Sequence, residues 1–227
     1  MRLALAFLVV ISAVPAAAQT VPLPAATPTA ADAAQQLASL VLPREAYVAL
    51  RVRSFEEGFA AAMNSDPQLA TLEKTKPGIT KAVAAAAREE ATEAFGAATD
   101  LLQTDAAQIY RRRFTAQELR TLIGFIAGPT GKAMVTMSME ATGDTASQVT
   151  ADRRAKAKAM FENPDATTKA ELTKLIVSGL LPKLRTTGPE IIALSARRFD
   201  DVDKLLEAAL PPRIEATIDA YSKRSTP

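Results

Sequence analysis

The sequence predicts an all-α fold: an irregular multi-helix bundle of roughly seven to nine helices with no sheet. Alanine fills 47 of the 227 positions, and it is the best helix former but a poor strand residue. Apolar residues also recur with helical spacing, as at Val202, Leu205, Leu206, Ala209 and Leu210. Strand-length alternation of apolar and polar residues is hard to find. With 48% hydrophobic and 23% charged residues, the chain has enough apolar material for a sizeable core.

The N-terminus has the pattern of a secretory signal peptide. A single positive charge at Arg2 precedes an apolar run over 3–14, and Ala16 and Ala18 then supply an A-x-A cleavage site. The run is too short for a spanning helix, which needs about 20 apolar residues. We therefore expect cleavage after Ala18, export to a bacterial periplasm, and no transmembrane segment in the mature chain. The alternative is an uncleaved N-terminal anchor.

Prolines and polar breaks divide the rest of the chain. After the signal peptide, 1–18, we expect a flexible proline-rich lead-in, 19–29, a single helical domain, 30–222, and a short tail, 223–227. Within the domain, the first helix is predicted over about 30–42. Pro43 can open the second, whose apolar face carries Tyr47, Val48, Val52, Phe55, Phe59 and Met63.

Further breaks are predicted at 64–67 and at 76–78, both of which contain proline. From 79 to about 113 one long helix is expected, and the small residues on its apolar face indicate close approach of a neighbouring helix. The spacing of Leu172, Leu175, Ile176, Gly179 and Leu180 predicts another helix. Residues 202–210 predict a further helix, and its pattern continues after Pro211 and Pro212.

A helix–corner–helix motif follows the long helix. Thr115 and Glu118 have the spacing of a capping box, and Phe114 and Leu119 have that of a hydrophobic staple. We expect Gly128 to end the helix in a left-handed conformation. The next residue, Pro129, suits the first turn of the following helix. The roles of Thr115 and Glu118 are predicted to lie in folding rather than in catalysis.

This stretch resembles a bacterial family, domain of unknown function 2059 (DUF2059), over about 105–160. The positions that carry the resemblance are Tyr110, Phe114, Thr115, Glu118, Leu119, Leu122, Phe125, Pro129 and Gly131. The family usually has Tyr where this chain has Ile126, and Ser where it has Gly128. Because the family's activity is not established, the resemblance implies a helical fold and an exported location, not a chemistry.

The composition excludes much catalytic chemistry. The sequence has no His and no Cys, so a Ser-His-Asp triad, a Cys nucleophile, a disulfide and a His/Cys zinc site are ruled out. We expect no metal, no cofactor and no catalytic residue. The remaining acid/base candidates are two carboxylate pairs, Glu89 with Glu93 and Glu56 with Glu57. For Asp200, Asp201 and Asp203 a helix-capping role is expected rather than metal binding.

The sequence leaves three functions open. The favoured one is non-enzymatic binding of a partner protein or a cell-envelope component. The alternatives are a binder of an apolar ligand or lipid and, less favoured, a carboxylate-based hydrolase of cell-wall glycan. The formal charge of +2 and the predicted export argue against nucleic acid, although Arg153, Arg154, Lys156 and Lys158 form a basic cluster. The sequence does not predict the oligomeric state.

Overall fold

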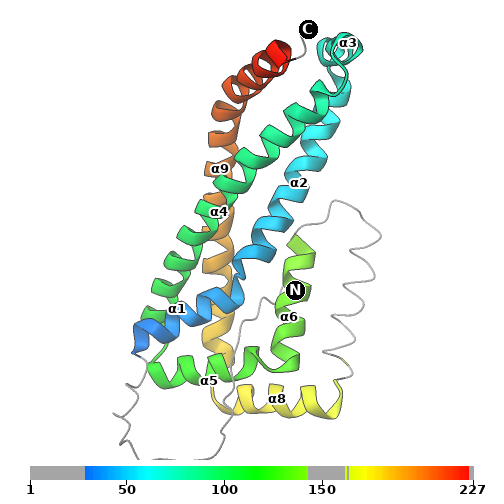
Figure 1. The fold of residues 1–227 in the computed structure, drawn as a ribbon. Coiled ribbons are helices and arrows are strands. Elements are labelled where there is room, and N and C mark those ends of the chain that lie inside the picture. Colours follow the sequence, from blue (N-terminus) through cyan, green and yellow to red (C-terminus); the bar gives the residue numbers. More distant parts are fainter. Residues whose placement is uncertain (1–28, 143–161, 163, 225–227) are drawn as a thin grey trace, which may run out of the picture. The chain divides into compact units, whose positions relative to one another are not determined.

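A computed structural model describes residues 29–142, 162 and 164–224, and within them every regular element is an α-helix (Figure 1). The described part contains no strand, which confirms the predicted all-α class. The number of helices agrees with the predicted range. In chain order they are α1 (Ala30–Val41), α2 (Arg44–Ser65), α3 (Pro67–Thr75), α4 (Ile79–Arg113), α5 (Ala116–Ile126), α6 (Pro129–Thr142), α8 (Ala166–Val177) and α9 (Leu180–Arg224).

The chain divides into two compact units, each built from two separate stretches. The first unit joins the chain up to Pro43 with Gln103–Ala193, and the second joins Arg44–Leu102 with the chain from Leu194 onward. Helices α4 and α9 each contribute residues to both units. The predicted signal peptide and almost all of the lead-in lie outside the described residues, and the single domain over 30–222 stays a prediction.

Helix boundaries follow the breaks predicted from the sequence. The long helix α4 begins and ends where expected, and α2 and α3 are separated at Asp66, whose carboxylate accepts hydrogen bonds from the Gln68 and Leu69 amides. At the start of α1, Thr29 and Asp32 form a capping box that the sequence analysis did not single out. These capped starts satisfy amides that have no acceptor inside the helix.

The core of the first unit is centred on α5. Helices α1, α6 and α8 each pack against it, and α6 also packs against α8. The apolar stripe of α5 is fully buried, as its spacing predicted, and α1 contributes Leu37 and Ala38 to the same core. The predicted hydrophobic core of the motif is therefore confirmed. In addition, Met134 and Val135 of α6 are buried and do not line an open groove.

The corner between α5 and α6 depends on the absence of a side chain at Gly131. A Cβ at this position would lie 2.4 Å from both the Phe125 carbonyl oxygen and the Ile126 Cα. The first turn of α6 thus lies directly against the backbone at the end of α5. Only glycine allows this approach, because real Cβ atoms essentially never come so near to backbone atoms.

The predicted left-handed conformation at Gly128 is wrong. Among the described glycines only Gly78 and Gly179 have a positive φ, and the residue that ends α5, Ala127, is right-handed at φ −76°. The following helix begins at Pro129, as predicted, and leaves no room for a left-handed closing turn. A Cβ on Gly128 would lie 2.9 Å from Glu171 Oε1 and 2.8 Å from the Phe125 oxygen, so close approach again explains the glycine.

The second unit has an aromatic centre with alanine-rich surroundings. Phe199 of α9 lies between Tyr47 and Phe95, with ring centroids 5.9 and 6.0 Å away, and the Arg51 guanidinium carbon lies 4.0 Å from its centroid. From α4, Ala87, Ala91 and Ala98 are buried. Their burial confirms that the small residues of this helix face its neighbours, which short side chains can approach closely.

Three predictions about the later helices are wrong. The periodic run over 172–180 is not one helix, because Gly179 (φ +71°) separates α8 from α9, and Ile176 is 59% exposed. Asp200, Asp201 and Asp203 do not cap a helix, since α9 begins at Leu180 and continues through them. Leu205, expected on the apolar stripe, is 64% exposed, while Val202 and Leu206 are buried.

We expect Gly131→Ala to destabilise the protein, because the new methyl group would push α6 away from α5. Overpacking of this kind typically costs about 1–3 kcal/mol of the free energy of unfolding. Gly58→Ala is the matched control: Gly58 lies in α2 with open space around it, and alanine there should stabilise by about 0.5–1 kcal/mol. Denaturant unfolding followed by circular dichroism measures both. Equal stability of Gly131→Ala and the unmodified protein would contradict the close-approach argument.

Candidate functional site

A groove of about 390 Å³ lies in the second unit between α2 and the beginning of α4. Its volume falls at the low end of the range of small-molecule sites, about 300–1,000 Å³. The groove is lined by Phe55, Glu56, Phe59, Ala60, Met63 and Asn64 of α2 and by Thr80, Lys81 and Ala84 of α4. The lining thus combines an apolar floor with a few polar groups at its margin.

The floor of the groove continues the apolar face of α2. Near the start of the helix, Tyr47, Val48 and Val52 are buried, as the sequence predicted. Toward its end, Phe55 and Phe59 are only half-buried, and their rings stack 5.5 Å apart at an interplanar angle of 18°. The same apolar stripe therefore serves the core at one end and a partly open groove at the other.

The wall of the groove depends on the turn between α3 and α4. Gly78 has φ +92°, and the Glu73 carboxylate accepts hydrogen bonds from the Gly78 amide (2.6 Å) and the Thr80 amide (2.9 Å). These bonds hold the pKa of Glu73 below its usual range. The Tyr221 hydroxyl of α9 donates to the Pro77 carbonyl at 2.6 Å. Together these contacts fix the first turn of α4, which carries the lining residues.

The charges around the groove are unequally compensated. Glu56 forms an ion pair with Arg88 at 3.3 Å. The Thr80 hydroxyl donates to Glu73 at 2.7 Å, so it is already engaged. Lys81 is exposed and has no ion-pair partner within the described ranges. Among the described residues, the groove consequently has one ammonium group, that of Lys81, without an ion-pair partner beside its apolar floor.

The second candidate is the motif corner of the first unit, where the predicted capping box is confirmed. The Glu118 amide donates to the Thr115 hydroxyl at 3.2 Å, and the Thr115 amide donates to the Glu118 carboxylate at 2.7 Å. The other Glu118 oxygen accepts a 2.6 Å bond from Lys183 of α9. Lys183 and the Thr115 amide hold the pKa of Glu118 below its usual range.

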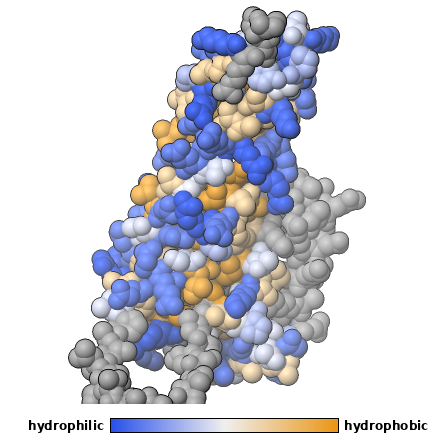
Figure 2. Space-filling view, viewed as in Figure 1, coloured by the Kyte–Doolittle hydropathy of each residue, from blue (hydrophilic) through white to orange (hydrophobic). Residues whose placement is uncertain are grey.

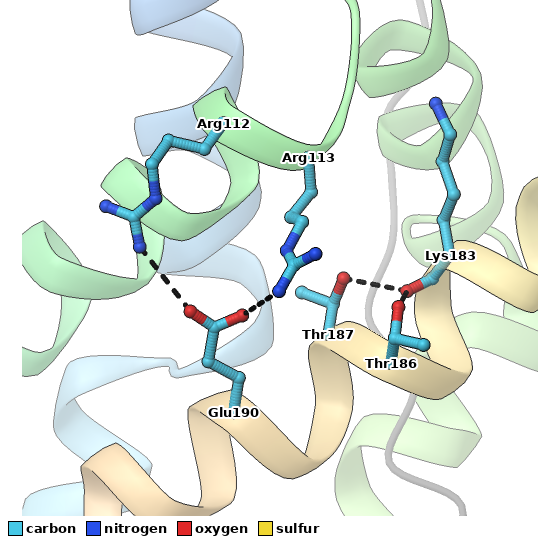
Figure 3. A network of polar contacts seen from close by, with 6 residues as sticks. All are labelled: Arg112, Arg113, Lys183, Thr186, Thr187 and Glu190. Atoms are coloured by element: carbon cyan, nitrogen blue, oxygen red, sulfur yellow. Dashed lines mark hydrogen bonds and ion pairs between the residues drawn. The ribbon is translucent and has the colours of Figure 1, made fainter.

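The arginines that end α4 form ion pairs in the same unit. Figure 3 shows the Glu190 carboxylate between Arg112 and Arg113, at 3.5 and 3.0 Å. In the turns before Glu190, the hydroxyls of Thr186 and Thr187 donate to the Lys183 carbonyl (Figure 3). These pairs and the Lys183–Glu118 bond connect the α4–α5 corner to the first turns of α9.

Every position that carries the family resemblance has a place in this architecture. Thr115 and Glu118 cap α5, Pro129 is the first residue of α6, and Gly131 is the close contact at the corner. The other members are buried: Tyr110, Phe114, Leu119, Leu122 and Phe125. Burial raises the pKa of the Tyr110 hydroxyl. None of these residues lines the groove of the second unit.

The carboxylate pairs proposed from the sequence do not converge on this groove. Glu56 is its only acidic lining residue among those described, and Glu89 forms an ion pair with Arg213 at 2.6 Å. Glu57 and Glu93 are exposed. The described residues contain no cluster of three His, Cys, Asp or Glu able to hold a metal ion. The basic cluster over 153–158 lies outside the described residues.

Sequence reasoning missed three features of these sites. Glu73 accepts a hydrogen bond from the Gly78 amide, five residues away, and Lys183 donates one to Glu118, 65 residues away. Neither separation matches the spacing of a local capping motif, so no short motif reveals these two residues. Lys81 is one exposed lysine among many in the sequence, and only the structure places it beside Phe59 and Met63. A usable signal was present for the floor, since the α2 stripe places Phe55, Phe59 and Met63 on one face.

Thr115→Ala should lower the free energy of unfolding by about 0.5–2 kcal/mol, because an amide of α5 loses its side-chain acceptor. Glu118→Gln should be milder, since an amide oxygen can still accept. The pKa of Glu118 is lowered in the folded state, so its stabilisation is present at neutral pH and is lost as pH falls through that pKa. The stability difference between Glu118→Gln and the unmodified protein should therefore vanish in acid. Thermal melts at neutral and acidic pH check this, and a difference that grows in acid would contradict it.

The comparisons with known proteins concern the motif corner, not the groove. Residues 100–158 match the model of the family DUF2059, described as an uncharacterized protein conserved in bacteria. No curated protein and no solved structure matches the chain. Over the described ranges, no helix combines the length and apolar character needed to cross a membrane. The resemblance inferred from the sequence is confirmed to this extent: residues 100–158 match the model of the bacterial family DUF2059.

Proposed function

We propose that the protein is exported to the periplasm and binds a partner protein or another component of the cell envelope without catalysing a reaction. The observation that carries this proposal is the α2–α4 groove, where Phe55, Phe59 and Met63 remain half-buried. An apolar group of the partner or component would occupy the groove and complete the burial of this floor.

The energetics favour such an occupant. Aromatic side chains each bury about 150–250 Å² when fully covered, and apolar burial stabilises by roughly 25 cal/mol per Å². A ligand that covers the two stacked, half-buried rings would therefore gain binding free energy from the apolar surface that it buries. On the face displayed in Figure 2, hydrophobic residues come to the surface between hydrophilic ones. Such surfaces are typical of interaction sites when several apolar side chains gather.

The carboxylates support a non-enzymatic role. Asp32, Glu73, Glu118 and Asp165 all have lowered pKa values, and in each case hydrogen bonds to nearby groups are the cause. They hold helix starts in place. Asp203 has a raised pKa because of burial, but it does not line the groove. A glycan hydrolase needs two convergent acids, one of them with a raised pKa, in a single cleft.

The export part of the proposal rests on the N-terminal pattern. Arg2, the apolar run over 3–14 and the Ala16-x-Ala18 end predict removal of the first 18 residues. We expect the protein recovered from the periplasm of the producing bacterium to begin at Gln19, as N-terminal sequencing would show. Recovery of the chain with Met1 in the membrane fraction would contradict export as a free protein.

Binding through the groove is tested with a neutral apolar dye, N-phenyl-1-naphthylamine, whose fluorescence rises in apolar sites. Saturable binding is expected, and Phe59→Ala should weaken it about five-fold or more, as for a side chain central to an interface. Alanine keeps the helix intact, and circular dichroism verifies folding. Leu205→Ala is the control, because Leu205 is an exposed apolar residue outside the groove. Absence of saturable binding, or equal losses in both variants, would refute the proposal.

A further inference from the structure

We propose that the groove between α2 and α4 binds an anionic amphiphile with a single acyl chain, whose acidic head group contacts Lys81. This inference rests on the proposed function, since it names the chemical class that the groove accepts. The chain of the ligand would lie over Phe55, Phe59 and Met63. The head group would carry a carboxylate or a phosphate, the two anions that an ammonium group binds well.

The apolar part of the groove fits one chain. The stacked rings of Phe55 and Phe59 form a flat floor, and Met63 adds a flexible, polarizable side chain that adapts to an irregular ligand. Ala60 on one helix and Ala84 on the other end at Cβ, so neither side chain fills the space above the floor. A volume of about 390 Å³ is near the lower limit for ligand sites, which favours one chain over two.

The charges of the groove select an anion. Glu56 is the only acidic side chain in the described lining, and Arg88 lies 3.3 Å from its carboxylate. The Glu73 carboxylate is directed at the amides of Gly78 and Thr80 and at the Thr80 hydroxyl. Among the described residues, Lys81 therefore supplies the one charge of the lining that no ion pair compensates. Its compact ammonium group on a flexible stem can follow a head group at the end of a chain.

The position of Lys81 on α4 points the same way. Lys81 is the third residue of this helix, where the positive end of the helix dipole makes a cation unfavourable. Helices more often carry an acidic residue in this turn. An anionic head group at Lys81 would interact favourably with both the ammonium group and the helix start. An apolar ligand without charge would leave this cation uncompensated.

The experiment compares ligands that differ only in the head group. Dodecanoate and dodecyl phosphate, each below its critical micelle concentration, and dodecanol, below its solubility limit, are used to displace the neutral dye from the mature protein. Dodecanoate or dodecyl phosphate should displace it at about three- to five-fold lower concentration than dodecanol, the range of a partly exposed ion pair. The preference should shrink at high salt, because exposed charges are screened. The better of the two anions identifies the head group.

Two variants assign the preference to Lys81. In Lys81→Gln the anion preference should fall to nearly one while dodecanol displaces the dye as before. Lys74→Gln is the matched control, because Lys74 is an exposed lysine of α3 outside the groove and its loss changes the net charge equally. The control should keep the full preference.

The outcomes separate this inference from the function on which it rests. If the alcohol and both anions displace the dye equally well, the selection of an anion is overturned and groove binding stands. If Lys74→Gln removes the preference as Lys81→Gln does, overall charge is responsible and the assignment to Lys81 is overturned. If the dye itself does not bind, the proposed function fails first.

Discussion

The structure depends on where its helices begin, because helix formation itself is easy in a chain this rich in alanine. At five helix starts a side-chain oxygen accepts a hydrogen bond from one or more backbone amides. Four of these side chains are the N-caps Thr29, Asp66, Thr115 and Asp165. The fifth is Glu73, which closes the turn before α4. The first four amides of a helix lack acceptors inside it, so each of these side chains decides the residue at which a helix starts.

The sequence reveals features that depend on neighbours within about four residues. The capping box at Thr115, the boundaries of α4 and the buried stripe of α5 were predictable because local spacing determines them. Contacts between distant residues were not, and the Lys183–Glu118 bond joins residues 65 positions apart. Likewise position 131 needs glycine because the backbone at the start of α6 lies against the backbone at the end of α5. The spacing of apolar residues in the sequence does not reveal such a contact. Leu205 shows the remaining difficulty, since helical spacing identifies a face but not whether another helix covers it.

The groove illustrates how one amphipathic helix serves two purposes. The stripe of α2 has the same chemistry along its length, yet its first half is buried and its second half lines an open site. The difference comes from the neighbour: alanines of α4 are buried farther along, whereas its first turn is held by Glu73 and Tyr221 and presents Thr80 and Lys81. A sequence pattern can therefore predict the floor of such a site, while the packing partner decides whether the floor is open.

The two regions differ in how their charges are compensated. Near the motif corner two exposed or half-exposed acids form ion pairs: Glu118 binds Lys183, and Glu190 binds both Arg112 and Arg113 (Figure 3). Compensated charges of this kind stabilise an arrangement and leave little for a ligand to recognise. Beside the groove, Glu56 is compensated by Arg88 and only the ammonium of Lys81 is left within the described lining. The proposal therefore assigns recognition to the groove, whose apolar floor and cation suit a molecule with an apolar part and a negative charge, and it assigns a structural role to the family motif.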